Sequence, residues 1–202
     1  MALHNMTYYF SKFQESEIKL RKIKANLRGI GFEFYSGSGV FSKDKIDKGT
    51  ELLINSCILT HGWKVLDFGC GYGAIGISIA KFFPDTNVLM ADINKRAVKL
   101  AKMNVKMNNI GNAHLTSSDL FQTINQRFNT IIVNPPQKAG KDVCFKIIEE
   151  AKNHLEPNGL LQLVARHNKG GKTLELKMKE VYGNVKEIAK KAGYRVYVSE
   201  LT

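Results

Sequence analysis

The sequence predicts an α/β fold built on a seven-stranded, mostly parallel sheet with a C-terminal antiparallel hairpin. From Thr50 onward, short apolar runs alternate with amphipathic helical patterns, which is typical of parallel strands joined by crossover helices. A glycine-rich turn, residues 69–73, joins the first of these runs to its helix, as in nucleotide-binding sheets. Two later runs joined by residues 191–193 suit a hairpin, which gives the sheet antiparallel strands at one edge.

The expected elements follow one another without a low-complexity linker or an internal repeat. Strands are expected at residues 64–67, 87–91, 113–116, 130–133 and 160–165, and in the hairpin at residues 185–189 and 194–199. Helices are expected at residues 74–80, 97–105, 143–154 and 173–182. We therefore expect one main domain over residues 51–202, preceded by an N-terminal extension over residues 1–50.

A basic segment within the extension has an ambiguous period. Alternation over residues 18–24 favours a basic strand, whereas Ile23 and Leu27 also fit one face of a helix. Its lysines suit a solvated edge that discourages pairing with other chains, and they also suit contact with a nucleic acid. Both interpretations of the segment stay open.

The composition favours a polyanionic partner. The chain has 202 residues and is 44% hydrophobic, which suits one globular domain and argues against two full domains. Its 30 Lys and Arg outweigh 18 Asp and Glu and give a net charge of +12. This charge favours a polyanion as the partner but does not by itself identify which one.

The cysteines and the apolar runs indicate a soluble cytoplasmic protein. Cys57, Cys70 and Cys144 are odd in number and far apart, so we expect a reducing compartment and no bound metal. No apolar run approaches the ~20 residues of a membrane span, and the N-terminus lacks the pattern of a secretory signal.

The glycine-rich turn predicts a nucleotide site. Gly69, Gly71 and Gly73 lie where the backbone can approach a ligand and a helix N-terminus stabilises negative charge. They also satisfy the fingerprint of dinucleotide-binding turns, so alone they do not separate a nicotinamide cofactor from another adenosine ligand. Asp67, directly before the turn, separates them, because its carboxylate repels a pyrophosphate and suits a cationic amino-acid end.

Two further carboxylates follow the next strand ends. Asp92 comes after the strand at residues 87–91 and can accept hydrogen bonds from both hydroxyls of a ribose. Asp119 comes after the strand at residues 113–116, where an adenine amino group would lie. Three ordered matches at consecutive strand ends predict an adenosine ligand with an amino-acid end.

Asp67-x-Gly69-Cys70-Gly71-x-Gly73, with Asp92 and Ser118-Asp119, resembles the class I S-adenosylmethionine-dependent methyltransferases, which have a Rossmann-like fold. The resemblance implies S-adenosyl-L-methionine as the cofactor, with its methionine end at the glycine turn, its ribose at Asp92 and its adenine at Asp119. The residues that it assigns to the cofactor are Phe41, Asp67, Gly69, Cys70, Gly71, Gly73, Asp92, Ile93, Ser118, Asp119, Leu120 and Asn134.

Asn134-Pro135-Pro136 predicts a rigid acceptor loop after the strand at residues 130–133, because prolines cannot continue a strand ladder. The side-chain oxygen of Asn134 and the carbonyl of Pro135 can each accept an N–H from a conjugated amino group, which turns the nitrogen lone pair toward a methyl donor. Attack on a sulfonium methyl then needs alignment, which contributes roughly 7–11 kcal/mol at best, and no strong base. We expect Asn134, Pro135 and Pro136 to be the catalytic residues.

This loop resembles that of the methyltransferases acting on planar nitrogen atoms, which include guanine-N2, adenine-N6 and glutamine-N5 enzymes. Nearly the whole chain resembles the catalytic domain of the small-subunit ribosomal RNA guanine-N2 methyltransferases, in their stand-alone archaeal-type form without the additional N-terminal copy of larger members. The matching segments are residues 38–42, 47–53, 69–73, 134–136, 139–141 and 193–196. The resemblance implies guanine N2 in ribosomal RNA as the acceptor and a lid over the cofactor formed by Phe41, Ser42 and residues 47–50.

Basic residues follow the fourth and fifth parallel strands, at Lys138, Lys141, Arg166, Lys169 and Lys172. We expect those after the strands to share the cofactor's edge of the sheet and bind RNA phosphates. His167 among them is expected to be a hydrogen-bonded structural residue. Gln137 stands where many relatives carry an aromatic residue, so a glutamine-N5 protein methyltransferase and a catalytically inactive RNA-binding module stay open as alternatives.

Overall fold

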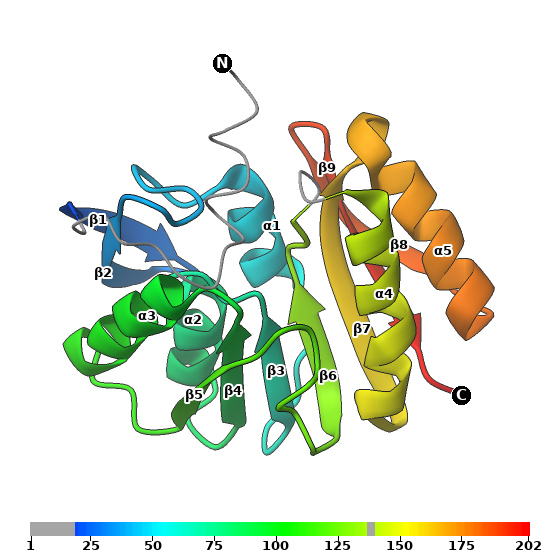
Figure 1. The fold of residues 1–202 in the computed structure, drawn as a ribbon, viewed down its shortest axis with the longest axis horizontal. Helices are drawn as coiled ribbons and strands as arrows, with labels where there is room; N and C mark the ends of the chain where they lie inside the picture. Colours follow the sequence, from blue (N-terminus) through cyan, green and yellow to red (C-terminus); the bar gives the residue numbers. More distant parts are fainter. Residues whose placement is uncertain (1–18, 137–139) are drawn as a thin grey trace.

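The computed structural model describes residues 19–136 and 140–202, and it has a central sheet covered by helices on both faces (Figure 1). The sheet has seven strands in the order β5-β4-β3-β6-β7-β9-β8. The strands are β3 (Lys64–Phe68), β4 (Asn87–Asp92), β5 (Ala113–Ser117), β6 (Phe128–Val133), β7 (Leu155–Arg166), β8 (Lys186–Lys191) and β9 (Tyr194–Glu200). Only β9 pairs antiparallel with its neighbours β7 and β8 within this sheet, which confirms the predicted fold class and the C-terminal hairpin.

Two apolar clusters attach the helices to opposite faces of the sheet. Helices α1 (Lys48–Ser56), α2 (Ala74–Phe82) and α3 (Lys95–Met107) share one cluster, and α4 (Lys141–Ala151) and α5 (Lys172–Tyr182) share the other. Neighbouring residues of one strand serve both clusters, since Ile132 packs in the first and Ile131 in the second, as expected for side chains that alternate across a strand. Short helical turns, η2 (Lys152–His154) and η3 (His167–Gly171), flank β7. None of the helices within residues 19–136 and 140–202 combines the length and apolar character that a membrane crossing requires.

The basic segment near the N-terminus is a strand. Strands β1 (Leu20–Leu27) and β2 (Ile30–Gly37) form an antiparallel hairpin, and the ammonium of Lys22 lies 2.6 Å from the carboxylate of Glu33. The hairpin is tied to α3, because the Asn104 side chain accepts from the backbone N–H of Tyr35 at 2.6 Å and donates to its carbonyl at 2.8 Å. The expected boundary between residues 50 and 51 falls inside α1, whose N-cap is Asp47.

The strand order creates a switch point at the centre of the sheet. The chain runs outward from β3 to β4 and β5, then returns to β6 on the other side of β3, where Phe68 pairs with Val133. In open α/β sheets, ligands bind in the crevice at the carboxyl ends of the strands at such a point. The glycine turn follows β3 and Asn134 follows β6, so both flank this crevice.

Candidate functional site

The glycine turn, residues 69–73, borders open space at the switch point. Gly69, Gly71 and Gly73 have φ of +71°, +57° and +94°, in the left-handed region that favours glycine. A Cβ added at Gly69 or Gly71 meets no described atom within 4 Å. The backbone N–H groups of Gly69 and Cys70 donate to the carbonyl of Ala91 at 2.8 and 3.0 Å, which holds the turn against β4. The turn therefore has a fixed backbone with room above it.

Asp67 is a buried carboxylate beneath this turn. Its Oδ2 accepts from the backbone N–H of Gly76 at 2.8 Å, an approach that needs glycine because a Cβ there would lie 2.5 Å from Met90. Its Oδ1 is buried and has no hydrogen-bond partner among the residues that the structure describes. Burial raises the pKa of Asp67 to about 7, against the opposing effect of the Gly76 bond and with a further rise from Asp92. This oxygen is an acceptor that a ligand's amino group would satisfy.

Asp92 joins the glycine turn to the next strand end. Its Oδ2 accepts from the N–H of Gly71 and its Oδ1 from the N–H of Asn94, both at 2.8 Å. Burial raises the pKa of Asp92, while these two bonds oppose the rise. Each oxygen keeps capacity to accept a second hydrogen bond, as a pair of ribose hydroxyls would require.

The predicted adenine residues lie one strand further along the same edge. The N–H of Ser118 donates to the backbone carbonyl of Asp92 at 3.1 Å, which brings the end of β5 beside the end of β4. Ser118 is buried, Asp119 is exposed, and Leu120 and Ile93 are half-buried. The predicted residues thus follow the strand order β6, β3, β4, β5 along one edge of the sheet.

The loop after β2 lies over the Asp92 end of this edge. The Asn94 side chain donates to the carbonyl of Gly39, and the Arg96 guanidinium donates to the carbonyl of Ser38, both at 3.0 Å. Phe41, at the tip of the loop, is 56% exposed. An aromatic side chain this exposed, on a loop bound to Asn94 and Arg96, is available for contact with a ligand.

Asn134 lies between the glycine turn and helix α1. Its Nδ2 donates to Oγ1 of Thr50 at 2.9 Å and lies 3.4 Å from Oδ2 of Asp47. Pro135 is buried and Pro136 half-buried, which fixes the start of the acceptor loop. Three residues that the sequence analysis singled out after it, Gln137, Lys138 and Ala139, lie outside the described residues. The segment 47–50, expected as a lid, forms the first turn of α1 and its capping residue.

Cys70 and His167 have the surroundings of structural residues. Cys70 is buried, and burial raises the pKa of its thiol, so the thiol stays protonated at neutral pH. His167 Nδ1 lies 2.8 Å from the hydroxyl of Tyr197, the hydrogen-bonded structural arrangement that the sequence predicts.

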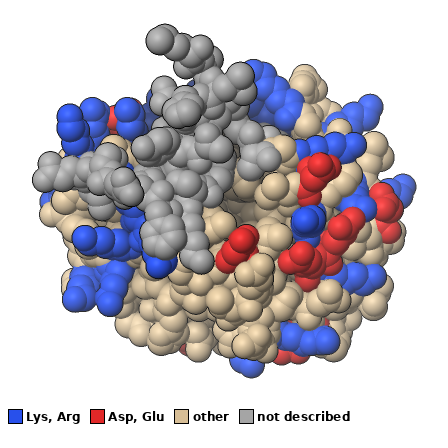
Figure 2. Space-filling model, viewed as in Figure 1, with Lys and Arg blue, Asp and Glu red and all other residues tan. Residues whose placement is uncertain are grey.

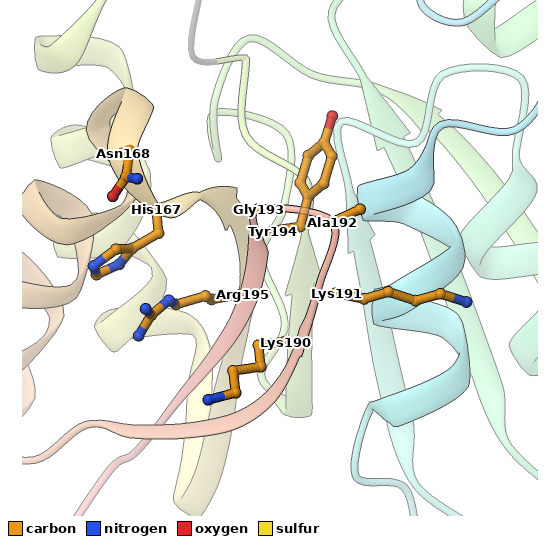
Figure 3. Close-up of a pocket in the computed structure, with 8 residues that line it drawn as sticks. All are labelled: His167, Asn168, Lys190, Lys191, Ala192, Gly193, Tyr194 and Arg195. Carbon is orange, nitrogen blue, oxygen red and sulfur yellow. The ribbon is translucent and has the colours of Figure 1, made fainter.

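A basic cavity of about 350 Å³ opens at the turn between β8 and β9 (Figure 3). Its described lining residues include no Asp or Glu, and they are His167, Asn168, Lys190, Lys191, Ala192, Gly193, Tyr194 and Arg195. In Figure 3, Lys190 and Arg195 extend from one side of the hairpin, while Lys191 extends from the other side toward α1. Arg195 forms an ion pair with Glu187. Because Arg166 at the end of β7 pairs with Tyr194, this turn lies at the same edge of the sheet as the switch point.

The contacts that the β8–β9 turn makes with the site were not predicted from the sequence. The guanidinium of Arg166 lies 4.9 Å from the centre of the Tyr194 ring, and the Tyr194 hydroxyl donates to Oδ1 of Asp47 at 3.0 Å. The direction of the hairpin strands could have predicted where this turn lies. In a sheet of parallel strands, the turn of a hairpin whose first strand runs with the others lies at their carboxyl edge, so the position of Lys190, Lys191 and Arg195 at the same edge as the crevice was predictable.

Comparison with known proteins reveals relatives over most of the chain. A family model described as methyltransferase small domain matches residues 31–198. The uncharacterized protein YbxB of Bacillus subtilis is 38% identical over 192 residues, which cover 94% of this chain and 96% of that protein.

Other relatives are longer than this chain. Ribosomal RNA small subunit methyltransferase C of Haemophilus influenzae is 34% identical over 165 residues, or 78% of this chain and 50% of that protein. The structure of a T. thermophilus 16S rRNA N2 methyltransferase (RsmC) in complex with AdoMet and guanosine is similar, with a TM-score of 0.77 and 25% identity. That match covers 94% of this chain and 52% of the other. The chain therefore spans about half the length of these rRNA methyltransferases.

Proposed function

The chain belongs to the methyltransferase small domain family, and on that premise we propose that it transfers a methyl group from S-adenosylmethionine to N2 of guanine in ribosomal RNA. The observation that carries the proposal is the position of Asn134 beside the glycine turn, with its amide nitrogen bound to Thr50. The names of the small subunit methyltransferase C relatives, and the RsmC structure with AdoMet and guanosine, support this acceptor. The excess of basic residues supports an RNA substrate, and the rRNA methyltransferase relatives support action in the cytoplasm.

The described residues fit S-adenosylmethionine. The unpaired buried Oδ1 of Asp67 suits the cationic amino group, and the space above Gly69 and Gly71 suits the methionine end. Asp92 would hold the ribose, and the residues at the end of β5 would hold the adenine. When bound, the cofactor supplies an electrophilic methyl group on a sulfonium ion.

The pH dependence of cofactor binding tests the role of Asp67. Because burial raises its pKa to about 7, Asp67 must ionise to pair with the ligand's ammonium, and affinity should fall up to about tenfold per pH unit below that value. Affinity should also fall above about pH 8, where an α-amino group loses its proton. Asp92 and the Cys70 thiol interact electrostatically with Asp67, and burial raises the pKa of each, so Cys70 contributes no charge in this range. Isothermal titration from about pH 5.5 to 9 measures the profile.

Asp67→Asn is the comparison for that titration. This variant should bind the cofactor more weakly, and its affinity should no longer depend on pH below 7.

The stability of the protein without cofactor should change with pH in the opposite direction to the affinity. A carboxyl with a native pKa near 7 and an unfolded pKa near 3.9 binds more protons in the native state, so stability should decrease as pH rises between about 4 and 7. If the pH profile of cofactor affinity were unchanged in Asp67→Asn, Asp67 would not be a cofactor-binding residue.

The acceptor loop supplies alignment for the reaction. The lone pair of a guanine amino group is delocalised into the ring, so the group is a poor nucleophile until its N–H bonds are oriented. Oδ1 of Asn134 and the carbonyl of Pro135 would each accept one N–H, and the rigid Pro135-Pro136 backbone would keep the two acceptors in register. The nitrogen lone pair would then point at the methyl group, the new N–C bond would replace the S–C bond, whose electron pair stays on sulfur, and solvent would take the extra proton from the methylated nitrogen. This step needs positioning and no strong base.

Basic side chains near the crevice support RNA as the substrate. Figure 2 shows Lys and Arg side chains along the upper rim of the molecule, on the side where the parallel strands end in Figure 1. The basic cavity at the β8–β9 turn lies at the same edge, so a phosphate bound there would belong to a nucleotide near the acceptor.

The cavity predicts a change in the salt dependence of RNA binding. Replacing Lys190 and Arg195 together by glutamine should reduce the slope of log affinity against log salt by about 0.7–0.9 for each phosphate that these side chains neutralise in the wild-type complex. Fluorescence anisotropy with a labelled small-subunit rRNA fragment measures it. Lys64→Gln with Lys186→Gln is the matched control, because both lysines are exposed at the first residues of β3 and β8, at the opposite edge. Equal slopes for the two double variants would mean that the cavity does not bind RNA phosphates.

Transfer of labelled methyl groups tests the proposed function. The protein is incubated with tritiated S-adenosylmethionine and separated rRNA, tRNA, DNA and protein fractions from cells that lack it. Label in rRNA alone supports the proposal. Label in protein favours a glutamine-N5 enzyme, and no label in any fraction despite cofactor binding favours an inactive RNA-binding module.

A further inference from the structure

The hydrogen-bond partners of Asn134 allow its side-chain amide only one orientation. Its Nδ2 lies 2.9 Å from Oγ1 of Thr50 and 3.4 Å from Oδ2 of Asp47. A carboxylate accepts hydrogen bonds and donates none, so Asp47 can face the NH₂ group of the amide but repels its carbonyl oxygen. Oδ1 of Asn134 is therefore turned away from α1.

Asp47 is itself held by donors from two elements. Its Oδ2 caps α1 by accepting from the N–H groups of Gly49 at 2.9 Å and Thr50 at 3.2 Å. Its Oδ1 accepts from the hydroxyl of Tyr194 at 3.0 Å, a residue 147 positions further along the chain. With both oxygens engaged, the carboxylate cannot rotate away from Asn134 without losing a hydrogen bond.

Tyr194 reaches Asp47 because Gly49 has no side chain. A Cβ at Gly49 would lie 2.7 Å from two ring carbons of Tyr194. The guanidinium of Arg166 lies over the ring, 4.9 Å from its centre, and stabilises it from the side of β7. Figure 3 shows the ring standing away from Lys190 and Arg195 and beside α1. The first turn of α1, the end of β7 and the start of β9 thus meet around the Tyr194 ring.

We propose that Tyr194, Asp47 and Thr50 are positioning residues that orient the Asn134 amide, so that its oxygen and not its nitrogen faces the acceptor's amino group. This inference rests on the proposed function. A flipped amide would present its own NH₂ to an amino group that is also a donor, and the methyl acceptor would lose its alignment. The hairpin at the C-terminal end of the sheet thereby helps to set the reacting geometry on β6.

A purely structural role makes different predictions for the same residues. If Asp47 only capped α1, its replacement would lower stability by about the usual cost of a lost cap, and the Thr50 hydroxyl and the Tyr194 hydroxyl would have no effect on catalysis. Thr50→Val is the sharpest variant, because it keeps the shape of the side chain and removes the shorter of the two hydrogen bonds that the Asn134 amide donates, at 2.9 Å, while Asp47 stays in place. Thr50→Ser keeps that acceptor and tests for rescue.

Steady-state kinetics on the full chain measures the consequence. Thr50→Val is expected to lower kcat by about 10- to 100-fold, because small misplacement of a reacting group costs this much, with the Kd for S-adenosylmethionine within about twofold of wild type. Thr50→Ser should stay within about threefold in kcat, and Tyr194→Phe should lower kcat by a smaller factor than Thr50→Val. Tyr182→Phe is the matched control, because the Tyr182 hydroxyl donates to the Ile148 carbonyl at 3.2 Å on the other face of the sheet.

Nuclear magnetic resonance of ¹⁵N-labelled protein measures the orientation without turnover. The Asn134 side-chain NH₂ signals, assigned by their loss in Asn134→Ala, should shift and exchange faster with water in Thr50→Val, and stay near wild type in Thr50→Ser and Tyr182→Phe. Unmoved signals in Thr50→Val, or moved signals with wild-type kcat, would overturn the proposal. If the wild-type protein methylates no acceptor, the proposed function fails, and the NH₂ signals alone still decide whether Thr50 orients Asn134.

Discussion

Asn134→Ala is expected to lower methyl transfer to rRNA by about 10²- to 10³-fold, which is the usual cost of removing one pre-organised hydrogen-bonding group from an active site. The substitution removes the oxygen that would accept the N–H of the acceptor, while Asp67, Asp92 and the glycine turn keep their contacts. Although the resemblance also assigns Asn134 to the cofactor, these remaining contacts should keep the Kd for S-adenosylmethionine within about threefold of wild type. Initial rates with tritiated cofactor and isothermal titration measure the two quantities.

Asn125→Ala provides the matched control, because Asn125 is an exposed asparagine in the connection before β6. It should leave both the rate and the cofactor affinity unchanged. A rate for Asn134→Ala within a few fold of wild type would contradict the proposed role of Asn134, because the acceptor would then be aligned by other groups.

Gly71→Ala is expected to weaken cofactor binding by about 10- to 100-fold, the cost of forcing an additional methyl group into a filled site. Gly71 has a φ of +57°, and an added Cβ points into space free of described atoms, where the methionine end of the cofactor would lie. The strain of alanine in the left-handed region should lower stability by only about 1–2 kcal/mol. Titration with S-adenosylmethionine and thermal unfolding measure these two effects.

Gly62→Ala separates the two causes. Gly62 has a φ of +77° and an equally open Cβ position, but it lies in the turn before β3, at the opposite edge of the sheet. It should lose a similar amount of stability and retain full cofactor affinity. Equal cofactor affinities for the two variants would mean that the glycine turn does not border the cofactor.

The sequence predicted the parts of the site that follow parallel strands. The glycine turn, Asp92 and Asn134 each come directly after an apolar run, and Asp119 follows the predicted strand at residues 113–116 by three positions. Parallel strands end at one edge, so their order along the chain was enough to bring them together. The structure confirms the fold and this shared edge. The roles of these residues toward a cofactor and an acceptor stay predictions.

The contact between Asp47 and Tyr194 was beyond sequence reasoning. It joins residues 147 positions apart and depends on a glycine that admits the ring, and no local pattern encodes such a pairing. Helix α1 was missed for a related reason, since it has only nine residues and contains Gly49 in its first turn. Its stability comes from the Asp47 cap and from packing in the apolar cluster that also holds α2 and α3.

Strand β7 begins earlier than predicted, at Leu155 in place of residue 160. Pro157 and Gly159 disfavour a regular strand, and the pairing of β6 with β7 shifts register between Phe128 and Thr130 to accommodate them. The local sequence pattern therefore predicted the regular part of β7. Pairing with β6 extends the strand toward its N-terminal end.

The most direct test of the central claim is mass spectrometry of nucleosides from small-subunit rRNA incubated with the protein and S-adenosylmethionine. We expect N2-methylguanosine with the wild-type chain and its loss with Asn134→Ala. A methyl group on another base, or on guanine at another atom, would contradict the proposed function.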